Sequence, residues 1–506
     1  MTDRTDPPVL WALLQIAALS LHMPLGLMTG SQRALASVSG VVIVSLGTAT
    51  VFTGLYFLIR RIVGSGWRAL ALVSVAIVLF WHGSSPAGLT GVLGWTSSLI
   101  LAALVFTAAY RFAERRLFKL ATFVGAMTMA ITLIVLTVVD TVTTPEPVVG
   151  ATSVIPDISL TSTPDIYLVL LDGYGRADVL DDLYSYDNSS FMDDLRASGF
   201  DVAPSSSSNY TITHLSLPSL LEMSYMNEPL DYMNNSDLQA LARVTSGDNT
   251  LVRTLKDAGY TYVHGDSDHW FNTCGPSVDV CLPGPLLDVT GHTLLATTPV
   301  GDLFYPVSGD PTTALNRTRI DEMTSWSDVR PQTDDPVFAF LHLVLPHPPL
   351  FLDRECAVRV DPELGGRILN DGRIDEAHLQ RRKDAWVEQL ECANKTVFEF
   401  LGQIDDEAVV VLTSDHGPDS AFVIESADPE DLTTDLLRER LPTLTAVRMP
   451  ESCRGTLPED IHTVNLFRRV LGCLSDTELD MLDSRYFAAS FGGSIVELDY
   501  ANELAD

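Results

Sequence analysis

Residues 409–417 read Val-Val-Val-Leu-Thr-Ser-Asp-His-Gly, an apolar run that ends in two potential metal ligands, Asp415 and His416. A short apolar run rich in β-branched residues is typical of a buried strand. In open α/β sheets, ligands bind at the carboxyl ends of the strands. An adjacent Asp and His are also compatible with plain turn residues, but their place after a buried strand favours a metal site.

In the rest of the C-terminal part, predicted strands alternate with predicted helices. Apolar runs predict three more strands, at 166–171, 260–264 and 337–344. Amphipathic stretches predict four helices, at 190–197, 251–258, 376–404 and 464–471. Such alternation predicts an α/β domain with a mainly parallel central sheet.

Two further segments place polar groups where these elements meet. The run 166–171 leads directly to Asp172, and Arg176 follows after Gly-Tyr-Gly. Residues 205–219 read Ser-Ser-Ser-Ser-Asn-Tyr-Thr-Ile-Thr-His-Leu-Ser-Leu-Pro-Ser, so a polar loop with Asn209 enters an apolar helical stretch at Thr213. A Thr at this junction meets the positive end of the helix. Taken alone, Asp172 and Thr213 are each also compatible with a helix cap.

Two histidine segments follow the other predicted strands. One contains His264, Asp266 and Trp270, and the other ends at His347. His342, inside the strand, is expected to face the core. Together the segments predict a divalent metal held by Asp172, Asp415 and His416 with Thr213 as a further ligand. Such a metal activates the Thr hydroxyl as a nucleophile and offsets phosphoryl charge, and the histidine segments would bind the leaving group or move its proton.

The N-terminal part of the chain differs sharply in charge from the C-terminal part, which is strongly acidic. Residues 1–150 hold 9 Lys/Arg and 5 Asp/Glu, whereas the remainder holds 23 and 60, and the whole chain of 506 residues has a net charge of −33. A surface this acidic excludes a nucleic-acid partner. A membrane span needs about 20 apolar residues, and five candidates are present: 9–28, 40–59, 69–81, 88–110 and 120–139.

The loop charges predict how these spans are oriented. Eight Lys/Arg fall on the side of the N-terminus and one, Arg33, on the other. The positive-inside rule then places the N-terminus in the cytoplasm, and five crossings place the acidic part outside. A stretch rich in Thr, Pro and Ser reads as a linker. We therefore expect a transmembrane domain at 1–142, a linker at 143–164 and an extracytoplasmic catalytic domain at 165–506.

All six cysteines lie in the acidic part, which fits an exported domain with disulfides. Six cysteines allow 15 pairings. Pairing of nearest neighbours is our prediction: 274 with 281, 356 with 392, and 453 with 473. A zinc site built from cysteines is the weaker reading, because no Cys-x-x-Cys pair exists.

These motifs resemble the alkaline phosphatase/sulfatase superfamily and, within it, the membrane-anchored branch of lipoteichoic acid synthases and phosphoethanolamine transferases. The resemblance covers nearly the whole chain, five spans included. It rests on Asp172, on Thr213-His-Leu-Ser-Leu-Pro and on Ser-Asp415-His416-Gly. It implies zinc, manganese or magnesium bound by Asp172, Thr213, Asp415 and His416. The substrate-side residues expected from it and from the motifs are His264, Asp266, Trp270, His347, Asn209 and Arg176.

Three positions depart from the family pattern. The transferases usually carry Glu where this chain has Asp172, a shorter carboxylate. The synthases place an Arg after their His-Gly segment, whereas this chain has Thr273 after Asn272, which puts phosphoglycerol transfer in doubt. Formylglycine sulfatases need an Arg four residues after the modified Cys or Ser, whereas Leu220 stands there after Ser216, so a sulfatase of that type is not expected.

The sequence thus predicts a membrane-anchored, metal-dependent phosphotransferase with a Thr nucleophile, acting on cell-envelope lipid or glycan phosphoesters. One alternative is an extracytoplasmic phosphatase, phosphodiesterase or other sulfatase-like hydrolase with the same site. A second is a non-catalytic envelope scaffold that retains the fold.

Overall fold

The computed structural model describes residues 6–27, 38–82, 91–143, 155–156, 158–226, 235–266, 272–282, 289–296, 298, 311–359, 364, 376–420, 429–475, 477–489 and 494–499. The chain forms two compact units. The first comprises Met1–Pro145 and Leu286–Ser308, and the second comprises Glu146–Pro285 and Gly309–Asp506. The first unit thus includes a segment, 286–308, that the sequence analysis placed within the catalytic domain.

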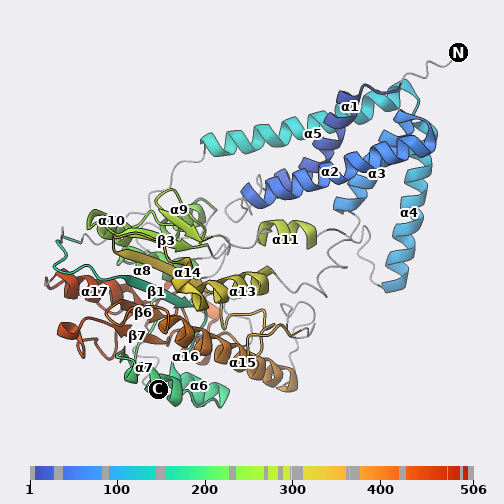
Figure 1. Cartoon of the computed structure of the whole chain (residues 1–506). Coiled ribbons are helices and arrows are strands. Elements are labelled where there is room, and N and C mark those ends of the chain that lie inside the picture. The colour runs from blue at the N-terminus through green and yellow to red at the C-terminus, as the bar shows by residue number, and fades with distance from the viewer. Residues whose placement is uncertain are drawn as a thin grey trace. The chain divides into compact units, whose positions relative to one another are not determined.

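The N-terminal unit contains the five helices that the apolar runs predict (Figure 1). They are α1 (Val9–Leu27), α2 (Val38–Val63), α3 (Gly66–His82), α4 (Gly91–Phe112) and α5 (Arg116–Thr143). Within the described residues, α1, α2 and α5 are long and apolar enough to cross a membrane, whereas α3 and the 102–112 stretch of α4 are shorter apolar helices.

The helices of this unit bury one set of apolar side chains against one another and expose another set on their outer faces. Ala12, Ile16 and Ile77 are fully buried, whereas Leu46 is 63% and Leu117 82% exposed. The short helix α11 (Val289–Ala296) adds Leu294 to the same cluster. An apolar outer surface of this kind is expected of helices surrounded by lipid.

A seven-stranded sheet organises the second unit. Its strands are β1 (Ile166–Leu171), β2 (Asp201–Val202), β3 (Thr261–Gly265), β4 (Val280–Leu282), β5 (Val337–Leu343), β6 (Val409–Thr413) and β7 (Thr445–Arg448). Their order is β2-β7-β6-β1-β5-β3-β4. The pairs from β6 to β4 are parallel, and β7 alone pairs antiparallel with both of its neighbours. The predicted mainly parallel sheet is confirmed.

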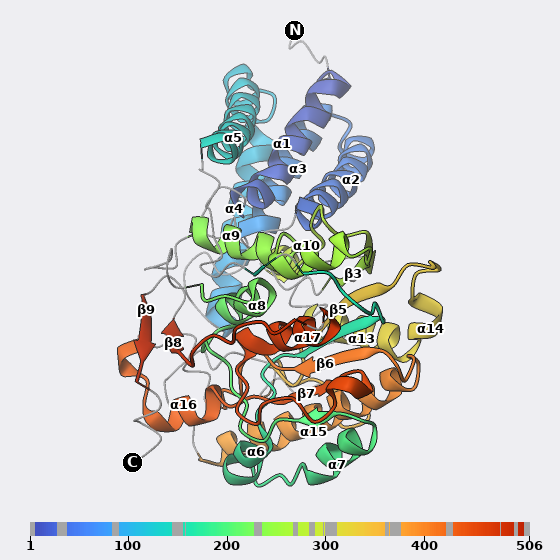
Figure 2. The ribbon, with the colours of Figure 1, turned by 90° about the vertical axis from the view of Figure 1, so that its left-hand side faces the viewer.

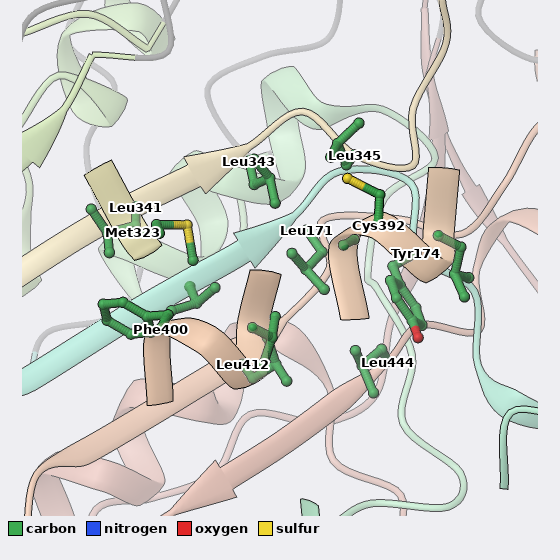
Figure 3. Packing of buried hydrophobic residues seen from close by; sticks show 14 of the residues in the cluster. Leu171, Tyr174, Met323, Leu341, Leu343, Leu345, Cys392, Phe400, Leu412 and Leu444 are labelled. Carbon is green, nitrogen blue, oxygen red and sulfur yellow. The ribbon is translucent and has the colours of Figure 1, made fainter. Parts of the chain in front are cut away.

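Helices cover both faces of this sheet (Figure 2). On one side lie α8 (Thr213–Glu222), α10 (Thr250–Asp257) and α17 (Leu466–Ser475), and on the other lie α6 (Ala177–Tyr184), α7 (Ser189–Ala197) and α15 (Glu376–Leu401). Side chains of β1 alternate between the layers, because Tyr167 and Leu171 join one buried cluster and Leu168 and Leu170 the other. The first cluster brings Leu171, Leu412 and Phe400 together between sheet and helices (Figure 3). A sheet buried on both faces explains why its strands read as continuous apolar runs.

The remaining described elements complete this unit. Its helices are α6 (Ala177–Tyr184), α7 (Ser189–Ala197), α8 (Thr213–Glu222), α9 (Asn235–Thr245), α10 (Thr250–Asp257), α13 (Pro311–Thr324), α14 (Trp326–Val329), α15 (Glu376–Leu401), α16 (Thr434–Arg440) and α17 (Leu466–Ser475). A separate hairpin joins β8 (Tyr486–Ala489) to β9 (Ile495–Leu498).

All three predicted disulfides are present: Cys274–Cys281, Cys356–Cys392 and Cys453–Cys473. No free cysteine is left in the chain. The alternative reading of a zinc site built from cysteines is therefore excluded, because sulfur atoms in disulfides are not thiolate ligands.

Candidate metal centre

The sheet topology brings the separate motifs to one edge. Asp172 follows β1, while Asp415 and His416 follow β6, which is the neighbour of β1 in the sheet. Thr213 is the first residue of α8. The N-caps of α6 and α8 are Arg176 and Ile212, so neither Asp172 nor Thr213 serves as a cap there.

The four predicted ligands form one buried cluster. Nε2 of His416 lies 3.0 Å from Oγ1 of Thr213, 3.1 Å from Oδ2 of Asp415 and 3.7 Å from Oδ1 of Asp172. Asp172, Asp415 and His416 each offer one ligand atom within 4.8 Å of the others. Three segments more than 200 residues apart at their extremes thus converge on a single point.

Hydrogen bonds fix how His416 presents its ring. Nδ1 donates to the carbonyl oxygen of Gly417 at 2.9 Å, so Nε2 carries the lone pair, and that atom faces the cluster. A backbone carbonyl that orients a ligating imidazole in this way is usual around protein-bound metals.

The donor set fits a divalent metal. Asp172 Oδ1 and Asp415 Oδ2 are buried and have no hydrogen-bond partner within the described part of the chain, a costly arrangement for carboxylate oxygens unless a cation neutralises them. Asp415 uses its other oxygen, Oδ1, to accept from the backbone N–H of Gly173 at 3.1 Å. Two carboxylates, one imidazole and one hydroxyl suit zinc, manganese or magnesium.

The electrostatic surroundings favour the protonation states in which these candidate ligands would bind a metal. Burial alone disfavours an ionised Asp172, but His347, His342 and His416 face it and hold its pKa well below the ordinary range. Burial and the positive charge of Arg440 lower the pKa of His416. A metal site needs this combination of an ionised carboxylate and a neutral imidazole.

His342 lies beside the centre, although the sequence analysis expected it to face the core. It is fully buried on β5, the other neighbour of β1, and its Nε2 lies 3.3 Å from Oδ2 of Asp172. Its Nδ1 accepts from the side-chain amide of Asn272 at 3.0 Å. The side chain is buried as expected, and it also faces Asp172, because a buried strand residue near the carboxyl edge can lie beside a neighbouring strand-end side chain.

His347 lies close to the centre, as its motif suggests. Its backbone N–H donates to the carbonyl oxygen of Asp172 at 3.0 Å, and its ring centroid is 6.3 Å from that of His416. With Gly173 and Arg440 it lines one small cavity. This is the position from which a side chain can reach a group bound at the metal centre.

His264 and Asp266 lie at the end of β3, where the sequence places them. Tyr262 donates its hydroxyl to Nδ1 of His264 at 2.6 Å, and burial together with the charge of Arg319 lowers the pKa of His264 to about 3. Arg319, from α13, donates to the carbonyl oxygen of Asp266 at 2.5 Å. Arg319 thus brings a guanidinium to the segment of His264 and Asp266, although the sequence motif around these two residues contains no arginine.

Of the other three residues expected to bind substrate, the two that the structure describes are not found beside the metal-type cluster. Both amide atoms of the fully buried Asn209 are used internally, since Nδ2 donates to the Arg485 carbonyl and Oδ1 accepts from the Val464 N–H. This geometry gives Asn209 a structural role in holding the loop before Thr213. Arg176 pairs with Asp178 and lines a separate cavity of about 530 Å³. Trp270 lies outside the described residues.

Residues 164–469 match the family model described as Sulfatase. The fold and the strand-end cluster of possible metal ligands define an α/β enzyme, and the match shows that this chain belongs to the sulfatase family. The predicted resemblance to the alkaline phosphatase/sulfatase superfamily is thereby confirmed, as is an enzyme of sulfatase-like transferase or hydrolase type.

Similar solved structures include two kinds of protein. The integral membrane lipooligosaccharide phosphoethanolamine transferase A from Neisseria meningitidis is 14% identical, with 90% of this chain and 79% of that chain covered and a TM-score of 0.39. The periplasmic domain of EcEptC from Escherichia coli in complex with Zn is 11% identical, covering 69% and 97%, with a TM-score of 0.42. A 2-O GAG sulfatase is 12% identical, covering 65% and 77%, with a TM-score of 0.40. No curated protein sequence matches the chain.

Proposed function

We propose that this chain is a membrane-anchored, metal-dependent phosphotransferase that acts on phosphoesters of cell-envelope lipids or glycans through Thr213. One observation carries the proposal: the Thr213 hydroxyl lies 3.0 Å from Nε2 of His416, within the cluster that includes Asp172 and Asp415. A hydroxyl in a metal ligand set is positioned as a nucleophile. A non-catalytic scaffold has no need of four buried metal-type side chains.

The residues divide the chemistry between them. Asp172, Asp415 and His416 would hold a zinc, manganese or magnesium ion, which when bound acidifies the Thr213 hydroxyl and offsets phosphoryl charge. Thr213 gives up its hydroxyl proton to water, and its Oγ1 forms a bond to phosphorus while the bond from phosphorus to the leaving-group oxygen breaks, which gives phosphothreonine. His347 donates a proton to the leaving oxygen. A hydroxyl of the acceptor then attacks phosphorus and gives its proton to His347, while the bond from phosphorus to Oγ1 of Thr213 breaks and Thr213 takes up a proton from water.

The membrane setting supports a lipid or envelope substrate. The positive charges of the loops favour a cytoplasmic N-terminus and, with five crossings, an extracytoplasmic catalytic domain. The three disulfides of the second unit fit an oxidising compartment. A phosphoester donor that is itself a membrane lipid would meet this enzyme at the surface to which it is anchored.

Hydrolysis is the second candidate, and the match to the sulfatase family favours it. A sulfatase of the formylglycine type does not fit, because Ser216 is buried and its hydroxyl is within hydrogen-bond distance of Ser208 Oγ and Tyr210 O. Water in place of the acceptor hydroxyl would give a phosphatase or phosphodiesterase with the same Thr213 nucleophile. Only the fate of the phosphothreonine distinguishes the two reactions.

Intact-protein mass spectrometry tests the proposal. The purified full chain is incubated with Mn²⁺ or Zn²⁺ and an extract of envelope lipids, beside Thr213→Ala and Thr213→Ser. We expect a metal-dependent adduct on the wild type, none on Thr213→Ala and some on Thr213→Ser, because a serine hydroxyl can attack in the same way. The mass of the adduct identifies the transferred group.

The same experiment separates the alternatives. Product linked to an added acceptor supports a transferase, whereas steady release of free headgroup or phosphate without such product supports a hydrolase. Full activity of Thr213→Ala would refute the mechanism. A chain that binds no metal and forms no adduct would instead support the alternative of a non-catalytic envelope scaffold.

A further inference from the structure

Arg440 brings a buried positive charge into the metal centre. It is the last residue of α16, is 1% exposed, and its Nη2 lies 3.0 Å from Nε2 of His416. Oγ1 of Thr213 lies at the same distance from that nitrogen. The guanidinium and the nucleophile therefore converge on one atom of a metal ligand.

Backbone contacts hold the guanidinium in this place. Nε donates to the carbonyl oxygen of Thr211 at 2.7 Å, and Nη1 donates to that of Gly417 at 3.3 Å. Thr211 lies two residues before the nucleophile, and Gly417 follows His416. Arg440 thus joins the loop that carries Thr213 to the loop that carries the metal ligands, and both contacts leave Nη2 directed at the centre.

A metal ion and Arg440 compete for the same lone pair. His416 donates from Nδ1 to the Gly417 carbonyl, so Nε2 has one lone pair, and Nη2 of Arg440 donates to it here. An ion bound by His416 must take this lone pair and release Nη2. The released N–H remains in the pocket of Thr213, where it can donate to an anionic phosphoryl oxygen, the partner for which a guanidinium is best suited.

We propose that Arg440 is the anion-binding residue of this centre: it donates to His416 in the metal-free enzyme and to a phosphoryl oxygen of the substrate in the metal-loaded enzyme. The inference rests on the proposed function and adds a positively charged, substrate-binding residue to the proposed site. Asp172 and Asp415 together cancel the charge of a divalent ion, so Arg440 supplies positive charge beyond that balance for a phosphoester anion. Asp419, which lines the same cavity, offsets part of this charge.

This role has a consequence that a purely structural residue does not share. Arg440→Met removes a cation and a competing hydrogen bond, so metal is expected to bind roughly tenfold more tightly, the equivalent of one charge-assisted hydrogen bond. The same variant is expected to bind phosphate more weakly and to lose roughly 10²-fold in transfer rate, as when one donor to a transition-state oxyanion is removed. Metal affinity and anion affinity move in opposite directions.

Two titrations of the full chain in detergent test this, with the protein first stripped by a chelator. Zn²⁺ is titrated calorimetrically, and inorganic phosphate is then titrated into the zinc-loaded protein. Arg438→Met is the matched control, because Arg438 lies on the same helix, half exposed, and pairs with Asp182 at 3.7 Å. Arg438→Met is expected to match the wild type in both titrations.

The outcomes are distinct. Tighter zinc with weaker phosphate in Arg440→Met supports the proposal, whereas unchanged or weaker zinc affinity, or unchanged phosphate affinity, in a folded variant overturns it. If Arg440→Met does not fold, Arg440→Lys is tested in its place. Lysine keeps the positive charge but lacks the paired N–H donors of the guanidinium, so the proposal still requires weaker phosphate binding. Neither titration depends on turnover, so a wild type without transferase activity would refute the proposed function and leave this test intact.

Discussion

At the scale of single residues, His264 gives a pH dependence that stability measurements can isolate. Its pKa is lowered to about 3 by burial and by Arg319, against about 6.5 in an unfolded chain. Between these values the unfolded chain binds the proton and the folded chain does not. His264 therefore contributes stability above about pH 6.5 that is lost as the pH falls toward 3, at roughly 1.4 kcal/mol per pH unit.

The variant His264→Gln removes this titration and keeps an acceptor for Tyr262. We expect its free energy of unfolding, from denaturant titrations at pH 7, 6, 5 and 4, to fall less steeply with acid than that of the wild type. Other groups titrate in both proteins and cancel in the comparison. Parallel curves for the two proteins would show that His264 is not held neutral by the fold.

Some residues of the candidate site could be identified from local motifs, and others could not. Asp172, Asp415 and His416 each follow an apolar strand directly, so the strand-end rule identifies them from neighbours in sequence. Arg440 has no such signal, because it reaches His416 from a helix 24 residues later. His342 and Arg319 are comparable cases, since their roles depend on which strands become neighbours, and local sequence does not state this.

At the scale of elements, α15 is the helix whose packing most directly supports the strands beneath the site. Phe400 on α15 is fully buried and contacts the rings of Tyr167 on β1 and Trp326 on α14. Phe400→Ala removes these contacts and is expected to destabilise the second unit by roughly 3–5 kcal/mol. Denaturant unfolding followed by tryptophan fluorescence measures the change.

The adjacent Glu399 provides the control for this substitution. It is exposed on the same turn of α15, so Glu399→Ala is expected to change stability by no more than about 0.5 kcal/mol. A loss for Phe400→Ala that is as small as that of the control would contradict the packing described for this helix.

Element positions were easier to predict than element order. The strand predicted at 166–171 matches β1 at both ends, and the helix predicted from 376 ends at Leu401, just before Gly402, rather than at residue 404. The short strands β2 and β7 were not predicted, because two and four residues carry too little periodicity. Their antiparallel pairing comes from contacts between distant segments.

At the scale of the whole molecule, the most consequential prediction is on which side of the membrane each part lies. The charges of the loops place Arg115, between α4 and α5, in the cytoplasm, and five crossings place the second unit outside. All six native cysteines are in disulfides, so an introduced cysteine is the one free thiol in the protein. This makes thiol labelling a direct measure of sidedness.

Two exposed positions provide matched probes, Arg115→Cys in the loop and Ser198→Cys at the end of α7. With a membrane-impermeant maleimide on intact cells, we expect Ser198→Cys to be labelled and Arg115→Cys to be labelled only after permeabilisation. The wild type should stay unlabelled until reduced, because its sulfur atoms are paired. Labelling of Arg115→Cys but not Ser198→Cys in intact cells would place the metal centre in the cytoplasm, where envelope lipids of the outer leaflet are out of reach and reducing conditions disfavour three disulfides.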